Sequence, residues 1–246
     1  MLLRRFLGFA LGLGLLAGQA MAEGPEDVIR AKLKLAFPTA VVTAIKPTPV
    51  PGFYEVDSQN YENIYISGDG RFMLQGDLLE IRGSQIVNIS DEAMSAQRKV
   101  ALAKVDRKDM IVFPAAGNKP KAAVYVFTDV DCGYCRKMHT EVPKLNKMGI
   151  EVRYLAFPRT GPKSTASAKM DKVWCAVDRN TALTDAKKGG TNAGAQKAGC
   201  KSPVAEQFAL GVALGVKGTP SVFLEDGTQV GGYVPADELA SDLKVK

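Results

Sequence analysis

Residues 124–135, VYVFTDVDCGYC, join a short apolar segment to a pair of cysteines. The first five residues are apolar, aromatic or β-branched, a composition typical of a buried strand. Further on, Cys135, Met138 and Val142 follow one another at spacings of three and four, as on a helix with one apolar face. The sequence therefore predicts that Cys132 stands where a strand gives way to the N-terminus of a helix.

This position favours thiol–disulfide exchange at Cys132. The unpaired backbone N–H groups and the positive end of the helix dipole stabilise a thiolate there. The thiolate is the form of cysteine that attacks disulfides, and C-x-x-C motifs at helix starts have lowered pKa values. Cys135 lies one helical turn further on, within reach of a disulfide with Cys132. We interpret Cys132 and Cys135 as the catalytic cysteines of a redox-active dithiol.

Two other uses of a C-x-x-C motif fit this chain less well. A structural zinc site takes four ligands, commonly from two spaced pairs, but His139, Cys175 and Cys200 form no second pair. Haem attachment requires a histidine directly after the second cysteine, and Arg136 stands there. The sequence therefore predicts no metal site and calls for no cofactor. His139, the single histidine, is expected on the helix surface one turn beyond Cys135.

Residues 1–22 have the pattern of a cleaved secretory signal. Arg4 and Arg5 supply a positive start, and residues 6–16 form an apolar run too short to span a bilayer comfortably. Residues 20–22, AMA, then provide the small side chains that a signal peptidase requires. We expect cleavage there and export to the periplasm, an oxidising compartment in which disulfides persist. A retained N-terminal anchor is the alternative.

The charge balance gives no reason to expect a nucleic-acid partner. The chain carries a formal net charge of +6, and removal of Arg4 and Arg5 with the signal lowers this charge by two, to +4. This mild excess is spread along the chain, whereas nucleic-acid binding requires a clustered basic surface.

The mature chain, residues 23–246, has the length of two modest domains. Residues 25–37 carry apolar side chains at helical spacing, and a strand-rich passage follows. Strands are predicted there at residues 53–56, 61–66, 71–75 and 78–81. Asp69-Gly70 falls between two of them, a strong hairpin signal. A sheet this small buries little surface alone and would gain from pairing with a second copy. We assign residues 23–89 to an N-terminal dimerisation domain.

The remainder of the chain is predicted to be a linker followed by a catalytic domain. A helix begins near Ser90, a candidate cap, with acidic residues in its first turn, and runs to about Val105. Arg98 interrupts its apolar face, so we interpret residues 90–108 as a linker helix rather than a core element. Residues 109–246 alternate strands and helices, which indicates a βα arrangement. Strands are predicted at residues 110–113, 124–128, 150–157, 221–224 and 228–230, with a hairpin turn at Asp226-Gly227 between the last two. Helices are predicted from residue 132 and at residues 169–177, 204–214 and 235–243. The fold class is therefore mixed, α+β and α/β.

Several motifs resemble a known family. CGYC after a strand, with Thr219-Pro220 before a later strand, resembles the thioredoxin fold. FTDVDCGYC at residues 127–135, RYLAFP at residues 153–158 and ALGV at residues 209–212 resemble the DsbC family of periplasmic disulfide isomerases more closely. The order of small sheet domain, helical linker and catalytic domain also matches, so the resemblance covers essentially the whole mature chain.

Asp131 is a departure from the pattern, because an uncharged residue is expected before the first cysteine in this family. A carboxylate beside Cys132 repels its thiolate and so raises the pKa of that cysteine. As a helix cap, the same carboxylate would accept backbone N–H groups and steady the start of the helix. We expect repulsion to outweigh capping at the sulfur.

The resemblance implies features that the residue patterns alone do not. It implies a homodimer held by the N-terminal domains, with two thioredoxin-like catalytic domains facing a shared apolar cleft, each with a helical insertion. A membrane reductase of the DsbD type would keep Cys132 and Cys135 reduced. The bond between Thr219 and Pro220 would be cis and face these cysteines, in a loop that binds extended client chain. Finally, Cys175 and Cys200 would form a structural disulfide, with a second redox pair as the alternative.

The predicted function is that of a protein disulfide isomerase and reductase. The Cys132 thiolate attacks a wrong disulfide in a client protein and forms a mixed disulfide. A client thiol then resolves this intermediate to a different pairing, or Cys135 releases the client in reduced form. The resemblance also implies chaperone activity toward unfolded clients. Two alternatives remain open: a dithiol oxidase that donates its disulfide, and a chaperone-like binding protein in which the cysteines are secondary.

Overall fold

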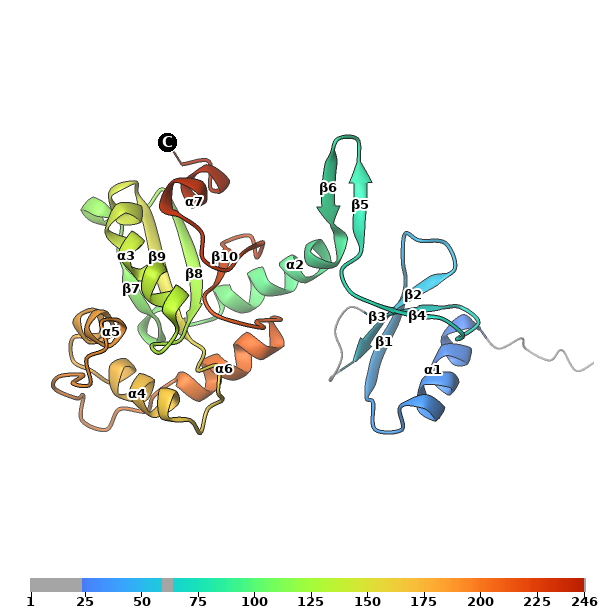
Figure 1. The fold of residues 1–246 in the computed structure, drawn as a ribbon, viewed down its shortest axis with the longest axis horizontal. Coiled ribbons are helices and arrows are strands. Elements are labelled where there is room, and N and C mark those ends of the chain that lie inside the picture. The colour runs from blue at the N-terminus through green and yellow to red at the C-terminus, as the bar shows by residue number, and fades with distance from the viewer. Residues whose placement is uncertain (1–23, 59–63, 246) are drawn as a thin grey trace, which may run out of the picture. The chain divides into compact units, whose positions relative to one another are not determined.

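The computed structural model describes residues 24–58 and 64–245, which form two compact units (Figure 1). The first unit ends at Gly76 and the second begins at Asp77. The predicted signal, residues 1–22, lies outside the described residues. Among the helices that the structure describes, none is long and apolar enough to cross a membrane.

The first unit packs one helix on a small antiparallel sheet. Its elements are α1 (Pro25–Ala36), β1 (Val42–Pro47), β2 (Phe53–Ser58), β3 (Ile64–Ser67) and β4 (Met73–Gln75), with the strands in the order β1-β2-β3-β4. Ile29 and Leu33 of α1 are buried in a core with Ile45 and Val56 of the sheet. The sequence analysis missed β1. This strand ends in a proline, which argues against a strand except at the edge of a sheet, and β1 is an edge strand. The strand predicted from residue 61 begins outside the described residues.

The hairpin predicted at Asp69-Gly70 is confirmed, since this turn joins β3 to β4. The Asp69 carboxylate accepts hydrogen bonds from the Ser67 hydroxyl at 2.5 Å and from the Arg71 amide at 3.0 Å. Gly70 has φ of +69°, and a Cβ there would lie 2.7 Å from Cγ of Lys32. Both the backbone conformation and the close approach of α1 therefore require glycine at this position.

The second unit opens with a hairpin that is hydrogen-bonded to the start of a helix. The elements are β5 (Leu79–Arg82), β6 (Gln85–Asn88), which the sequence analysis missed, and α2 (Ile89–Ala103). The predicted cap at Ser90 was wrong: Asn88 caps α2 by accepting the Asp91 amide at 3.0 Å. The Ser90 hydroxyl instead accepts the Leu78 amide at 2.8 Å and so connects the hairpin to the helix.

The second half of α2 belongs to the core, so its interpretation as a linker without a core role was wrong. Leu102 is 1% exposed and lies in one hydrophobic cluster with Tyr125 and Phe223. The Arg98 side chain is buried, donates to the Leu214 carbonyl at 3.1 Å and pairs with Asp91. Arg98 interrupts the apolar face in the sequence, but its charge is satisfied inside the protein. The domain limits inferred from the sequence remain predictions.

A five-stranded sheet forms the centre of the second unit (Figure 1). Its strands are β7 (Ile111–Phe113), β8 (Ala122–Thr128), β9 (Ile150–Ala156), β10 (Ser221–Leu224) and β11 (Gln229–Gly231), in the order β11-β10-β8-β9-β7. Only β8 and β9 pair in parallel, which confirms the predicted βα arrangement around the cysteines. The turn predicted at Asp226-Gly227 joins β10 to β11. Gly227 has φ of +92°, and a Cβ there would lie 1.9 Å from the Ser95 carbonyl oxygen of α2.

Helices cover both faces of this sheet. They are α3 (Gly133–Lys147), α4 (Thr165–Trp174), α5 (Arg179–Lys187), α6 (Val204–Ala213) and α7 (Ala236–Asp242), with short 3-10 turns at Arg107–Asp109 and Ala116–Asn118. Side chains of β8 alternate between the two faces. Val124 and Val126 lie in one cluster with Met138 of α3, whereas Tyr125 and Phe127 lie in another cluster, which includes Leu102 of α2. The sequence analysis missed α5.

Candidate active site

Cys132 is the N-cap residue of α3, four residues beyond the end of β8. Its sulfur accepts the Cys135 amide at 3.3 Å and lies 3.1 Å from the Thr219 carbonyl oxygen. Both cysteines are buried and unbonded to each other, whereas Tyr134 between them is 66% exposed. The predicted strand-to-helix position of Cys132 is therefore confirmed, and Tyr134 marks the surface nearest to the pair.

The surroundings of Cys132 favour its thiolate. Burial alone would raise the pKa of this cysteine, but hydrogen bonds from Thr219 and Cys135 lower it, as does the charge of Arg159. The balance leaves the pKa of Cys132 below its ordinary value. Among the described residues, the buried Thr219 hydroxyl has no other hydrogen-bond partner.

Cys135 has the opposite character. Burial raises its pKa, and the charge of Lys187 and hydrogen bonds from Thr219, Asp129 and Thr128 do not offset that rise. Two neighbouring thiols are thus differentiated, because the first is held at the helix terminus and the second lies one turn deeper in the core. This arrangement suits a nucleophilic thiolate beside a protonated resolving thiol.

Two further expectations about these elements are confirmed. The peptide bond between Thr219 and Pro220 is cis, and the loop before β10 brings it beside the cysteines. Cys175 and Cys200 form a disulfide, which joins the end of α4 to the loop before α6. The Lys197 amide also donates to the Cys175 carbonyl at 2.9 Å, so the disulfide lies in a hydrogen-bonded segment. The binding of client chain by Thr219 and Pro220 remains a prediction.

Asp131 does not cap α3, because the Cys132 sulfur occupies that role. Its carboxylate instead binds the Lys169 ammonium at 2.9 Å and lies 3.7 Å from the Arg136 guanidinium. The two cations offset the repulsion that a lone carboxylate would exert on the Cys132 thiolate.

Substitution Asp131→Thr is expected to lower the pKa of Cys132 by about half a unit at low salt. The reason is that the variant removes a negative charge next to Cys132 in the chain and leaves the Lys169 ammonium and the Arg136 guanidinium without that carboxylate partner. Titration of thiolate absorbance measures the shift, and the same titration at high salt serves as the control, since screening should reduce the difference. An unchanged or higher pKa would contradict this electrostatic role.

His139 is buried in the core, so the expectation of a helix-surface residue was wrong. Its ring lies 3.1 Å from the Tyr154 hydroxyl through Nδ1 and 3.0 Å from the Thr184 hydroxyl through Nε2. Burial, followed by the positive charges of Lys187 and Lys188, lowers its pKa to about 4. The side of α3 that carries His139 is covered by α5, the helix that the sequence analysis missed. With this lowered pKa, the imidazole is neutral at pH 7.

Sequence reasoning also missed two charged residues beneath the cysteines. Asp129 is 2% exposed, and its carboxylate accepts the amide and guanidinium N–H groups of Arg159 at 3.0 and 3.1 Å. Lys187 is 4% exposed and donates to the Thr128 hydroxyl at 2.6 Å and to the Asp129 carbonyl at 2.8 Å. A polar pair at the end of a buried strand, Thr128-Asp129, was the available signal for Asp129. No pattern in the sequence indicated that Lys187 would be buried.

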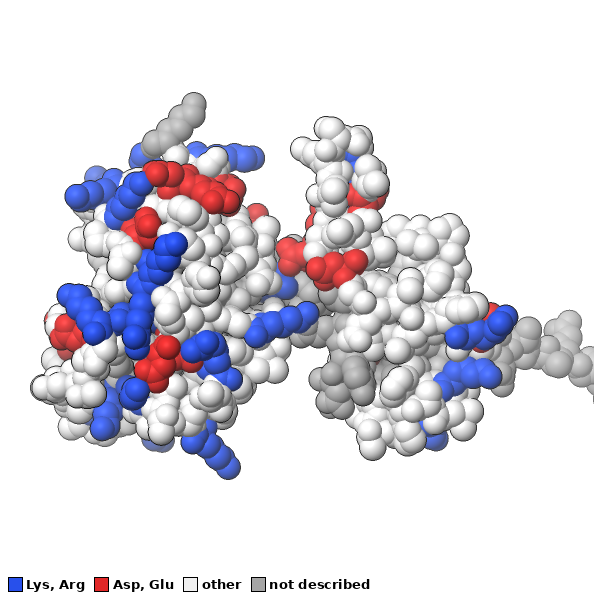
Figure 2. All heavy atoms as spheres, in the orientation of Figure 1, with Lys and Arg blue, Asp and Glu red and all other residues white. Residues whose placement is uncertain are grey.

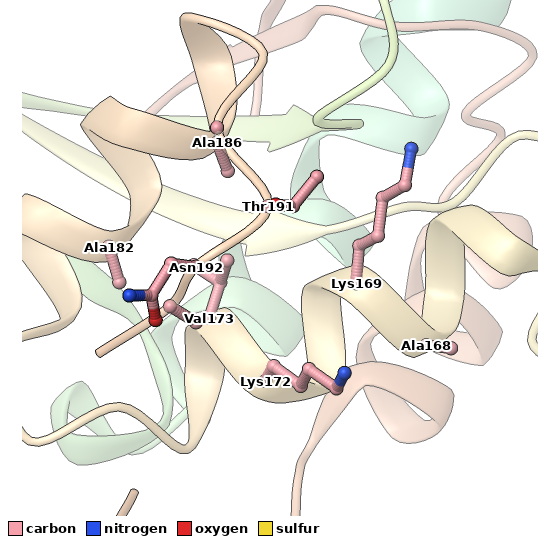
Figure 3. A pocket seen from close by; sticks show the side chains of 10 residues that line it. Ala168, Lys169, Lys172, Val173, Ala182, Ala186, Thr191 and Asn192 are labelled. Atoms are coloured by element: carbon pink, nitrogen blue, oxygen red, sulfur yellow. The ribbon is translucent and has the colours of Figure 1, made fainter. Parts of the chain in front are cut away.

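A cavity of about 180 Å³ lies between α4, α5 and the segment that follows α5 (Figure 3). Its lining includes Lys169, Val173, Ala182 and Asn192. Lys169 both lines this cavity and binds the Asp131 carboxylate.

Comparison with known proteins covers both units. A family model for the disulfide bond isomerase protein N-terminal domain matches residues 20–91, and one for a thioredoxin-like domain matches residues 107–245. The thiol:disulfide interchange protein DsbC of Escherichia coli is 38% identical over 237 residues, which cover 96% of this chain and 94% of that protein. DsbC of Haemophilus influenzae is 34% identical over 227 residues, 91% of each chain. The solved structure of a disulfide interchange protein from Neisseria gonorrhoeae covers 57% of this chain and 96% of its own, at 30% identity and a TM-score of 0.49.

Proposed function

The chain belongs to the DsbC family of thiol:disulfide interchange proteins, and we propose that Cys132 and Cys135 perform its disulfide isomerase chemistry as nucleophile and resolving thiol. The protein is a thiol–disulfide oxidoreductase with a thioredoxin-like domain. One observation carries the assignment of roles: the pKa of Cys132 is lowered and that of Cys135 is raised, although the two residues lie within one helical turn.

The reaction follows from these two states. The Cys132 thiolate attacks one sulfur of a client disulfide, forms a mixed disulfide and expels the other client sulfur as a thiolate. When a different client thiol attacks the client sulfur of the mixed disulfide, the client acquires a new pairing and the Cys132 thiolate is regenerated. When no client thiol arrives, Cys135 attacks Cys132, and the client leaves in reduced form while the enzyme becomes oxidised.

We assign client binding to the loop at Thr219 and Pro220. The Thr219 carbonyl lies 3.1 Å from the Cys132 sulfur, so an extended client chain that hydrogen-bonds to this backbone would present its disulfide to the nucleophile. Proline at the next position has no N–H group, so it offers a client chain only its carbonyl oxygen.

We propose that the protein is a homodimer joined through its N-terminal region. Clusters of exposed apolar side chains mark interaction surfaces. One such cluster in the first unit consists of Phe72, Met73 and Leu74, and the hairpin of the second unit exposes Leu79, Ile81 and Ile86. Much of the hairpin surface in Figure 2 is neither acidic nor basic. In addition, β4 is an edge strand of its sheet, with backbone groups available for pairing. The chaperone activity implied by the family pattern remains a prediction.

We further propose that the protein acts in the periplasm after cleavage of residues 1–22, with a membrane reductase of the DsbD type as its electron donor. The disulfide between Cys175 and Cys200 supports an oxidising compartment. An isomerase in such a compartment requires a source of electrons, because each reductive release of a client leaves Cys132 and Cys135 oxidised.

Alkylation trapping in intact cells tests this proposal. We expect Cys132 and Cys135 to be mostly reduced, and to become oxidised when the membrane reductase is deleted. Cys175 and Cys200 are the internal control, since they should stay disulfide-bonded and unalkylated in both strains. A mostly oxidised pair in cells that contain the reductase would instead support a dithiol oxidase.

A further inference from the structure

Three half-exposed cations contact residues 129–131, the short segment that leads into the nucleophile. They are Arg136 of α3, Arg159 of the loop after β9 and Lys169 of α4, and their side chains are 43%, 46% and 50% exposed. These three side chains form the cationic cluster. Their positions are far apart in the sequence, so the fold alone brings the charges together beside the active site.

The two guanidinium groups of the cationic cluster have terminal nitrogens to spare. Arg136 donates through Nε to the Val130 carbonyl at 3.2 Å, and its Nη2 lies 3.7 Å from the Asp131 carboxylate, too far for a hydrogen bond. Arg159 donates to the Asp129 carboxylate through its backbone amide and Nε, at 3.0 and 3.1 Å. In the described part of the chain, no hydrogen bond engages the terminal nitrogens of either arginine. Such N–H groups can bind an incoming carboxylate in bidentate fashion.

Lys169 brings the third positive charge. Its ammonium donates to both carboxylate oxygens of Asp131, at 2.9 and 3.0 Å, and Asp131 directly precedes the nucleophile. Lys172, one helical turn further along α4, is exposed and lines the same cavity as Lys169 (Figure 3). Asp171 between the two lysines is partly buried and offsets part of their charge.

The surface beside Cys132 therefore carries more positive than negative charge. The three cations stand against two carboxylates, Asp129 and Asp131. Asp129 is buried, so it cannot meet a client, and Asp131 is already bound by Lys169. A client chain that approaches the nucleophile meets a net positive surface, which attracts acidic segments and repels basic ones.

We propose that the cationic cluster selects acidic clients, so that the enzyme reacts fastest with disulfides whose neighbouring residues are aspartate or glutamate. This inference deepens the proposed function and rests on Cys132 as the nucleophile. The cations attract client carboxylates to the surface beside the sulfur and take no part in the exchange of bonds. A single exposed ion pair contributes little, so the selectivity comes from several charges acting together. It weakens as salt screens those charges.

Three peptides of equal length test the proposal, each with one internal disulfide flanked by glutamate, glutamine or lysine residues. The reduced mature protein is mixed with each peptide at pH 7, and the rate constant for attack on the peptide disulfide is measured at low and at high salt. A small uncharged thiol is reacted with the same peptides as a reference, because flanking charges also alter the reactivity of the disulfide itself. After division by the reference rate, the glutamate peptide should react about tenfold faster than the lysine peptide at low salt, and the ratio should fall toward one at high salt.

Variants of the mature protein locate the effect. Arg136→Gln combined with Lys169→Gln should bring the ratio of the glutamate rate to the glutamine rate toward one. Both peptides meet the same thiolate, so this ratio cancels any change that the variant causes in the reactivity of Cys132. Asp131→Asn frees the Lys169 ammonium and should raise the ratio about twofold. Lys147→Gln removes an exposed cation at the far end of α3 and is the matched control, in which the ratio should not change.

Two results overturn the inference. One is a reference-corrected ratio of glutamate to glutamine rates near one at low salt in the unmodified protein. The other is a ratio that the combined substitution leaves unchanged. If the unmodified protein attacks none of the three peptides, the proposed function itself fails.

Discussion

Substitution Cys132→Ser is expected to abolish the refolding of a client with scrambled disulfides, whereas Cys135→Ser should leave partial isomerase activity and accumulate mixed disulfides. The asymmetry arises because only Cys132 has its pKa lowered by its surroundings and begins the exchange. Cys135, whose pKa is raised, is needed only when no client thiol resolves the intermediate. Recovery of client activity measures isomerisation, and gel electrophoresis without reductant measures the trapped intermediate.

The fold of both variants must be intact for this comparison to hold. Circular dichroism checks it, and the disulfide between Cys175 and Cys200 should remain closed in both proteins. Equal loss of activity in the two variants, or mixed disulfides in Cys132→Ser rather than Cys135→Ser, would reject the assigned roles.

A fragment that begins at Asp77 is expected to be a folded monomer that reduces small disulfides but isomerises large clients poorly. It keeps the compact unit that contains the cysteines and loses the first unit, which carries the exposed residues Phe72, Met73 and Leu74. Light scattering measures the association state, and reduction of a small disulfide is compared with refolding of a scrambled client. A dimeric fragment, or one that isomerises as well as the full protein, would contradict this division of labour.

A shorter fragment that begins at Asp109 should be markedly less stable than the one that begins at Asp77. It lacks Leu102, whose burial is worth about 2 kcal/mol, and Arg98, which donates to the Leu214 carbonyl. The Ser95 carbonyl, which the turn at Gly227 approaches closely, is also lost. Urea denaturation of the two fragments measures the difference, and equal midpoints would show that α2 contributes nothing to the core of the second unit.

Features that depend on neighbouring residues could be predicted from the amino-acid sequence. Alternation of apolar side chains, the two cysteines and the following helical spacing placed Cys132 at the N-terminus of α3. Asp-Gly pairs marked the turns at residues 69–70 and 226–227, because the required backbone conformation is a property of those residues alone. The resemblance of short motifs to a known family then anticipated the cis bond before Pro220 and the disulfide between Cys175 and Cys200.

Which polar residues are buried could not be predicted in this way, because burial depends on the packing of distant elements. Arg98, His139 and Lys187 all lie at positions where sequence periodicity indicates a helix surface or gives no prediction, yet each is enclosed by an element distant in the chain. Arg98 is satisfied by the Leu214 carbonyl, and Lys187 by Thr128 and the Asp129 carbonyl. The free energy of burying a charge depends on those distant hydrogen-bond partners rather than on local propensity. The same dependence makes the pKa of Cys135 a property of the fold, because the charge of Lys187, which α5 supplies from a distant part of the chain, lowers it.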